Sequence, residues 1–513
     1  MEIRGIKVKK EPNKSKGFYM LRPANFYAVP LLYSSGQQSI RCVNVGDAVK
    51  EGTAIAKPNG KYGYFVYSPC SGKVVSIIKK LNVYGNECEH VVIGRDLSGQ
   101  THTFPVLGEE DVQPDVLLKR LYESGIVDNF EPFDVGYKKY LLKCPIKTLL
   151  VNCIEDDPFD YSATALLETY ESQIMEGARL FQKICNAEKI VFAFSLNQRK
   201  IAKQLKSYIR KLGLSKTLKI KFFPNIYPLH YSRLLGYYQT RKMVREGGRT
   251  AETGVIVESV CNCYDFYNAV RLGVPLTQRA ITISGKNCLR KANYFVKNGT
   301  SINHIMEVVG EQKSSFDYML VYGGVMSGIA QETSDISATL TSSTLLFCDT
   351  DEFSVENETA CINCGKCLEV CPVRLNVKEL DDLFFEGRYS KAKNMGVETC
   401  LECGCCSFVC PAKRFLTQRI TFMKDLALGR VGKKAESSGY VVVEGEDPNE
   451  QEKDTDEILD LKDNFSTDHQ NFDRSEVDQM IKELEEERNP KKTNKYAYKG
   501  PVINGEGGEK NEQ

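Results

Sequence analysis

The sequence predicts a multidomain protein of mixed α/β, β and α structure that ends in an acidic tail. Three observations lead to this prediction. The chain has 513 residues, more than a single hydrophobic core usually holds. Its hydrophobic period changes from that of strands to that of helices more than once. Eight of its 19 cysteines fall into two copies of one spacing near the C-terminal end.

Residues 1–105 are predicted to be β structure. Val45–Gly52 and Ser68–Val74 are strand pieces joined by glycine and aspartate turns. The pair resembles the two halves of the barrel-sandwich fold of biotinyl and lipoyl carrier domains. Lys61 lies near the position of a lipoyl lysine, but Gly60-Lys61-Tyr62 lacks the Asp-Lys or Met-Lys signature. Because a fold does not carry its chemistry with it, we do not expect a modified lysine.

Residues 106–270 alternate amphipathic helices with short apolar strands. The clearest strands are Lys147–Asn152 and Lys189–Phe194, and a long helical pattern runs between them from Ala163 to Ile184. This alternation is typical of a βαβ domain with a parallel sheet. Residues 271–345 return to short strands with glycine turns, among them Gly323–Gly328.

The last two regions are a helical domain at 346–432 and a tail at 433–513. In the helical domain, periodicity predicts helices over Val377–Ala392 and Phe415–Leu428. The tail is acidic and poor in aromatic residues, so we expect it to be largely disordered. Within it, Ser475–Leu484 has a capping box and an apolar stripe. This segment is either a helix that docks on a partner or a transient helix.

The charge is unevenly distributed. Residues 441–513 hold 21 acidic and 10 basic residues, a net charge of −11, so the first 440 residues carry +12. This positively charged part of the chain could bind anionic lipid or an acidic electron carrier. Alternatively, its charges could simply be solvated on the surface. No apolar run nears the roughly 18 residues of a membrane span, and Met1–Lys7 lacks a secretory signal's apolar stretch. We therefore expect a cytoplasmic protein that contacts a membrane only peripherally.

The repeated cysteine spacing, C-x2-C-x2-C-x3-C-P, is that of two-cluster ferredoxins. Three thiolates on one loop hold three corners of a cubane, and the cysteine before the proline ligates the other cluster. The first predicted [4Fe–4S] cluster is therefore bound by Cys361, Cys364, Cys367 and Cys410, and the second by Cys371, Cys400, Cys403 and Cys406. The alternative is two structural zinc sites, since C-x2-C pairs also bind zinc.

No other catalytic constellation is evident, and no catalytic residue is assigned. The five histidines are scattered, and the chain has no P-loop. Cys405 lies between two predicted ligands and is interpreted as a bystander. Cys261-x-Cys263 is interpreted as a packed pair rather than a ligand set.

Thr399–Arg414 resembles the second cluster motif of the RnfC family, the peripheral iron–sulfur subunits of the Rnf ion-translocating electron transport complex. Arg279–Gly285, Gly323–Gly328 and Lys147–Pro158 are similar to further segments of that family, and the resemblance extends to about residue 430. It implies a domain like the NADH- and FMN-binding domain of complex I over 106–270. It also implies a β-grasp (SLBB-like) domain over 271–345.

The sequence departs from the family at the flavin site. The family's glycine-rich loop is thought to hold FMN and NADH, and the matching stretch here is Ser124–Phe133. Every glycine after Gly125 is gone, and Asp128 and Glu131 bring negative charge. The segments Glu155–Pro158 and Tyr227–Ser232 also keep only part of the family's motifs. We therefore expect FMN and NADH binding to be lost or much altered, and assign no flavin-binding residue.

The resemblance implies an electron-transfer subunit of an Rnf-type, ion-translocating oxidoreductase on the cytoplasmic face of the cell membrane. Its partners would be membrane-embedded and flavoprotein subunits and a soluble carrier such as ferredoxin, flavodoxin or NADH, with no nucleic acid. The alternative is a soluble NADH- and FMN-dependent oxidoreductase similar to cobalamin reductase. A third hypothesis is a docking scaffold whose clusters are structural.

Overall fold

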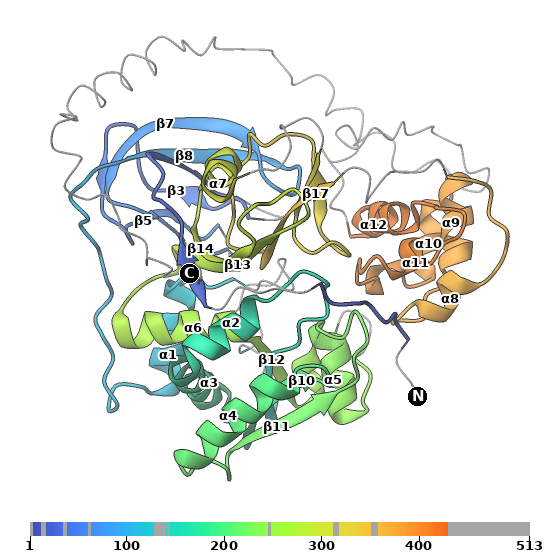
Figure 1. Cartoon of the computed structure of the whole chain (residues 1–513), viewed down its shortest axis with the longest axis horizontal. Coiled ribbons are helices and arrows are strands. Elements are labelled where there is room, and N and C mark those ends of the chain that lie inside the picture. The colour runs from blue at the N-terminus through green and yellow to red at the C-terminus, as the bar shows by residue number, and fades with distance from the viewer. Residues whose placement is uncertain are drawn as a thin grey trace, which may run out of the picture. The chain divides into compact units, whose positions relative to one another are not determined.

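The computed structural model describes residues 4–11, 17–33, 38–59, 63–127, 140, 144–244, 248–310, 318–349 and 358–428. Lys61, Asp128–Phe133 and the tail therefore lie outside the described residues. Figure 1 shows the described elements along the chain. Among the helices of these ranges, none has the length and apolar character needed to cross a membrane.

Two small antiparallel sheets form the N-terminal region, as the sequence predicted. One has the strand order β2 (Phe26–Pro30), β8 (Glu87–Arg95), β7 (Gly72–Leu81) and β4 (Ala48–Val49). The other contains β3 (Ile40–Arg41), β5 (Ala54–Lys57) and β6 (Val66–Tyr67). Their buried apolar residues join the largest hydrophobic core.

A four-stranded parallel sheet confirms the predicted βαβ region. Its strand order is β11 (Leu218–Phe223), β10 (Lys189–Ser195), β9 (Thr148–Asn152) and β12 (Val255–Ser259). The helical elements of this region are α1 (Pro114–Glu123), α2 (Ser162–Thr169), α3 (Glu171–Cys185), α4 (Arg199–Lys211), α5 (Ser232–Thr240), η2 (Thr250–Thr253), α6 (Val260–Tyr267) and the π-helical η3 (Asn268–Leu272). Apolar side chains fill both faces of the sheet, which is why the central strands β9 and β10 are largely hydrophobic and buried, whereas the edge strand β11 carries two lysines.

The single helix predicted from Ala163 to Ile184 is wrong, because Tyr170 interrupts it. Tyr170 leaves the helical conformation, and its ring centroid lies 4.7 Å from that of Tyr264 and 6.1 Å from that of Phe295. The aromatic cluster thus accounts for a break that helical periodicity does not reveal.

The third region is a six-stranded mixed sheet with a helix. Its strand order is β1 (Phe18–Met20), β14 (Ala292–Lys297), β13 (Gln278–Ser284), β17 (Thr344–Asp349), β15 (Tyr318–Tyr322) and β16 (Ile329–Gln331). Sequence analysis missed two features here. Helix α7 (Ile302–Val309) packs its apolar side chains into the core of this sheet. Strand β1 comes from the N-terminal region and pairs in parallel with β14.

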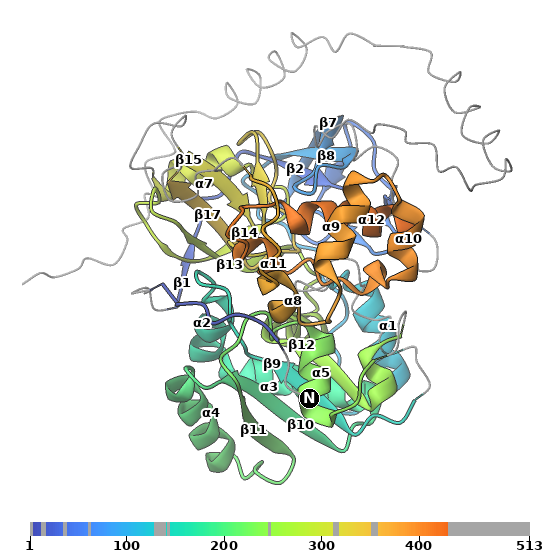
Figure 2. The ribbon, with the colours of Figure 1, turned by 90° about the vertical axis from the view of Figure 1, so that its right-hand side faces the viewer.

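The cysteine motifs lie in a small helical bundle, which Figure 2 shows at the front. It contains α8 (Lys366–Val370), α9 (Val377–Phe385), α10 (Tyr389–Asn394), η4 (Val397–Thr399), α11 (Cys405–Phe408) and α12 (Leu416–Ala427). The predicted helix at Phe415–Leu428 is confirmed by α12. The one predicted over Val377–Ala392 is two helices, because Gly387 takes a left-handed φ of 68° after α9.

Candidate iron–sulfur and cleft sites

The first cysteine motif lies on an exposed loop. Cys361 and Cys364 are exposed, whereas Cys367 is half-buried at the start of α8. Burial raises the pKa of the Cys367 thiol, and the neighbouring thiols of Cys410 and Cys361 raise it further. The pKa of Cys367 is thus affected by a cysteine of its own motif and by the last cysteine of the other motif.

The second motif is more enclosed. Burial raises the pKa of the Cys406 thiol to about 12, with added effects from Cys403 and Cys371. Burial likewise raises the pKa of Cys371, to which Cys403 also contributes. A cavity of about 20 Å³ is lined by Cys371, Cys400, Cys403, Cys405 and Cys406, among other residues. The last cysteine of the first motif thus lies among the cysteines of the second.

Donors surround the second set of sulfurs. The Leu375 N–H donates to Cys371 Sγ at 3.3 Å, and the Glu402 N–H donates to Cys400 Sγ at 3.4 Å. Thr417 Oγ1 lies 3.4 Å from Cys406 Sγ. Donors of this kind stabilise thiolates and tune the potential of a bound cluster.

The cysteine thiols fit an iron–sulfur cluster in chemistry and in number. Thiolates are the usual ligands of such clusters, and a bound metal deprotonates a coordinating thiol. Within the described ranges, no three side chains among His, Cys, Asp and Glu converge as they would around a single metal ion. A cubane, in contrast, places each thiolate on a different iron atom.

The second motif is held against the α/β region and the six-stranded sheet. The Tyr227 hydroxyl donates to the carbonyl oxygen of Cys403 at 2.8 Å, and the Cys405 thiol donates to the Tyr227 carbonyl at 4.0 Å. Cys405 is 1% exposed, so this residue, predicted to be a bystander, is a packing contact. Gly404 lies against the carbonyl oxygen of Met326, within the glycine turn that the sequence singled out.

A cleft of about 1380 Å³ adjoins this contact. It is lined by parts of the α/β region, the six-stranded sheet and the second motif, including Asp156, Asp157, His230, Tyr231, Arg233, Met326, Cys400 and Arg414. The acidic residues follow β9, at the carboxyl edge of the parallel sheet, where ligands of such sheets bind. The cleft is therefore a candidate ligand site beside the second motif.

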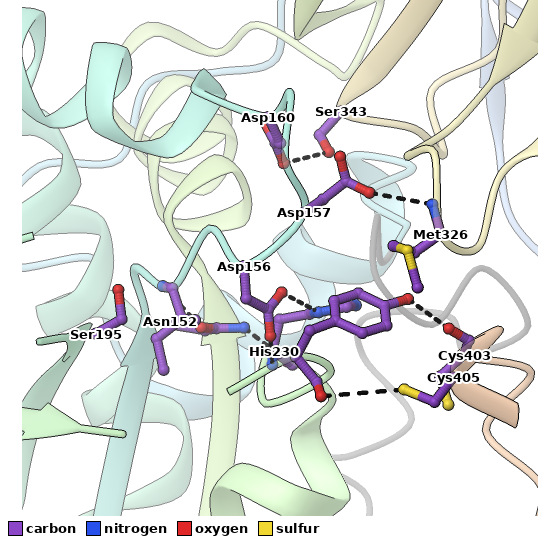
Figure 3. A network of polar contacts seen from close by, with 12 residues as sticks. Asn152, Asp156, Asp157, Asp160, Ser195, His230, Met326, Ser343, Cys403 and Cys405 are labelled. Carbon is purple, nitrogen blue, oxygen red and sulfur yellow. Dashed lines mark hydrogen bonds and ion pairs between the residues drawn. The ribbon is translucent and has the colours of Figure 1, made fainter. Parts of the chain in front are cut away.

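Asp156 and His230 form a buried pair in the cleft (Figure 3). Their Oδ1 and Nδ1 atoms are 2.5 Å apart, the His230 N–H donates to Asp156 Oδ2 at 3.1 Å, and Asn152 Nδ2 donates to the His230 carbonyl at 2.8 Å. Burial lowers the pKa of His230, but Asp156, together with Asp157 and Asp160, outweighs burial and leaves the pKa raised. Sequence analysis missed the pair because its members are 74 residues apart.

Four carboxyl groups that follow β9 line one part of the cleft. Burial raises the pKa of Glu155 to about 7 and that of Asp157 to about 6, and Asp156 and Asp160 lie beside them. Those carboxyl groups that are ionised oppose an anionic group beside them, although Arg233, Arg249 and Arg414 line other parts of the cleft. Of the glycine-poor loop, Ser124–Val127 is described, and the Val127 carbonyl accepts from buried Arg279.

Three family models match successive parts of the chain. The barrel-sandwich hybrid domain of RnfC matches residues 3–98, the FMN-binding domain of Nuo51 matches 129–268, and a 4Fe-4S dicluster domain matches 353–411. The chain is also similar to NAD+-reducing [NiFe]-hydrogenase in its air-oxidized and H2-reduced states. Identity is 13% in both comparisons, the TM-scores are 0.42 and 0.44, and 62% and 63% of this chain are covered. The chain spans 55% and 63% of the matched hydrogenase chains, less than two thirds of either.

The three domains define the class: they support an iron–sulfur electron-transfer subunit of an oxidoreductase. Together they fit an RnfC-like subunit. The dicluster match also supports iron–sulfur clusters as cofactors.

Proposed function

We propose that this protein is the electron-transfer subunit of an Rnf-type, ion-translocating oxidoreductase complex. Two [4Fe–4S] clusters would relay single electrons between a soluble donor or acceptor and flavoprotein and membrane-embedded subunits. Ion translocation would belong to those partners. The protein would lie peripherally on the cytoplasmic face of the cell membrane.

The observation that carries the proposal is the place of Cys371, which belongs to the first motif but lines a small cavity with Cys400, Cys403 and Cys406. In agreement with an exchange of the last cysteines between the motifs, Cys410 contributes to the raised pKa of Cys367, and Cys403 contributes to the raised pKa of both Cys371 and Cys406. This supports Cys361, Cys364, Cys367 and Cys410 as ligands of one cluster and Cys371, Cys400, Cys403 and Cys406 as ligands of the other. The chain's own part is to hold the thiolates, supply donors to them and exclude water; the clusters supply the one-electron chemistry.

Two cysteines of the second motif provide a matched test of this ligand set. Cys403→Ser should remove the second cluster and block electron passage, while residues 1–340 stay folded. Cys405→Ser alters an adjacent buried thiol outside the ligand set and should keep both clusters. Iron content and electron paramagnetic resonance (EPR) of the reduced proteins measure the outcome. Two clusters in Cys403→Ser would refute the assignment.

The domain organisation is part of the proposal. The antiparallel β13–β14 pair, followed by α7 and by β17 parallel to β13, supports a β-grasp domain over about 271–345. We place the barrel sandwich at 1–105, the domain like that of complex I at 106–270 and the cluster domain at 346–432. The acidic tail at 433–513 is a separate region of the sequence and lies outside the described residues.

NADH is the less favoured donor, because four carboxyl groups line the cleft after β9 and the glycine-rich loop is altered. Anaerobic addition of NADH to the purified protein, with bound flavin measured beforehand, tests this. We expect no bleaching of the cluster absorbance, although dithionite reduces the same clusters. Bleaching with flavin present would favour the alternative, an NADH- and FMN-dependent oxidoreductase similar to cobalamin reductase.

A further inference from the structure

Tyr227 joins the α/β region to the second cysteine motif. Its side chain is 1% exposed, and its hydroxyl donates to the carbonyl oxygen of Cys403 at 2.8 Å. Its own carbonyl accepts from the Cys405 thiol at 4.0 Å, and its backbone pairs with Ile6 at 2.9 and 2.8 Å. One residue thus holds the motif on both sides of Gly404.

The residues that follow Tyr227 in the sequence form part of the wall of the cleft. The ring of His230 lies with its centroid 5.7 Å from that of Tyr227 and 4.4 Å from that of Tyr231. His230 and Tyr231 both line the cleft. The first motif has a different setting, since Cys361 and Cys364 are exposed to solvent. A side chain on the cleft side, such as that of Tyr227, therefore contacts the second motif and not the exposed cysteines of the first.

We propose that Tyr227 is a positioning residue that raises the reduction potential of the second cluster and leaves that of the first unchanged. The inference rests on the proposed function, because it requires a cluster at this motif. Reduction adds a negative charge to the cluster. The Tyr227 hydroxyl points its hydrogen toward the Cys403 carbonyl, so the positive end of the O–H dipole faces the motif and stabilises that charge.

The test is an anaerobic redox titration of the full chain, followed by EPR. Cys403→Ser, which lacks the second cluster, assigns the two signals. In Tyr227→Phe we expect the reduction equilibrium of the second cluster to fall about threefold, ~30 mV for a one-electron couple. Tyr294→Phe is the matched control, because the Tyr294 hydroxyl also donates to a backbone carbonyl, that of Arg290 at 3.0 Å. It should change neither potential.

A second measurement does not depend on how well Tyr227→Phe folds. Replacing Tyr227 by 3-fluorotyrosine keeps the shape and makes the hydroxyl a stronger donor, so the potential of the second cluster should rise. Unchanged potentials in both altered proteins, or equal shifts of both clusters, would overturn the inference. If the unmodified protein binds no second cluster, the proposed function fails instead.

Discussion

Gly365 and Gly404 occupy the same place in the two cysteine motifs, and they provide a sharp test of how the second motif is held. Both have a left-handed φ of 76°. A Cβ added at Gly365 meets no atom within 4 Å, whereas one added at Gly404 lies 2.2 Å from the carbonyl oxygen of Met326. The alanine variants Gly365→Ala and Gly404→Ala therefore share the conformational cost of a left-handed φ. They differ in the contact with the Met326 carbonyl oxygen, which is present only at position 404.

The left-handed conformation costs an alanine roughly 1–2 kcal/mol, which applies to both variants. Relieving an overpacked contact typically adds about 1–3 kcal/mol. The free energy of unfolding should thus fall by about 1–2 kcal/mol in Gly365→Ala and by about 2–5 kcal/mol in Gly404→Ala.

Anaerobic urea unfolding, followed by far-UV circular dichroism, measures both losses of stability. EPR should show in addition that the signal of the second cluster is altered only in Gly404→Ala. Equal losses in the two variants would refute the reasoning, because Met326 would then not be packed against the second motif.

Two further predictions concern buried charges. Asp381 is 1% exposed and accepts from Arg414 at 2.6 Å and Arg419 at 2.9 Å, so Asp381→Asn should cost about 3–5 kcal/mol in urea unfolding. Its neighbour Asp382 is half-exposed and pairs with half-exposed Lys378, so an Asp382→Asn cost comparable to that of Asp381→Asn would contradict this. Stability should also fall as pH rises from about 5 to 8, because burial raises the folded-state pKa of Glu155 to about 7 and the pKa of His230 is also raised. A group whose pKa is higher in the folded state stabilises the fold fully at a pH below its unfolded-state pKa. This stabilisation is lost as the pH rises through the folded-state pKa. A free energy of unfolding that rises from pH 5 to pH 8 would exclude the effect.

Much of the architecture followed from local pattern. Strands β9 and β10 and helix α12 were predicted because a buried strand and an amphipathic helix carry their periods in the sequence. The breaks at Tyr170 and Gly387 were not predicted. At Tyr170 the helix ends where distant aromatic rings pack, and such packing overrides local propensity.

By itself, the sequence determined the two cysteine motifs and the expected exchange of Cys371 and Cys410, because ligand spacing is a local property of the chain. Only the tertiary structure decided which motif adjoins the cleft and which is exposed. It also brought together Asp156 with His230 and Tyr227 with Cys403, pairs that are 74 and 176 residues apart. Side chains so distant in sequence meet only when sheets and helices pack, and no local period records that meeting.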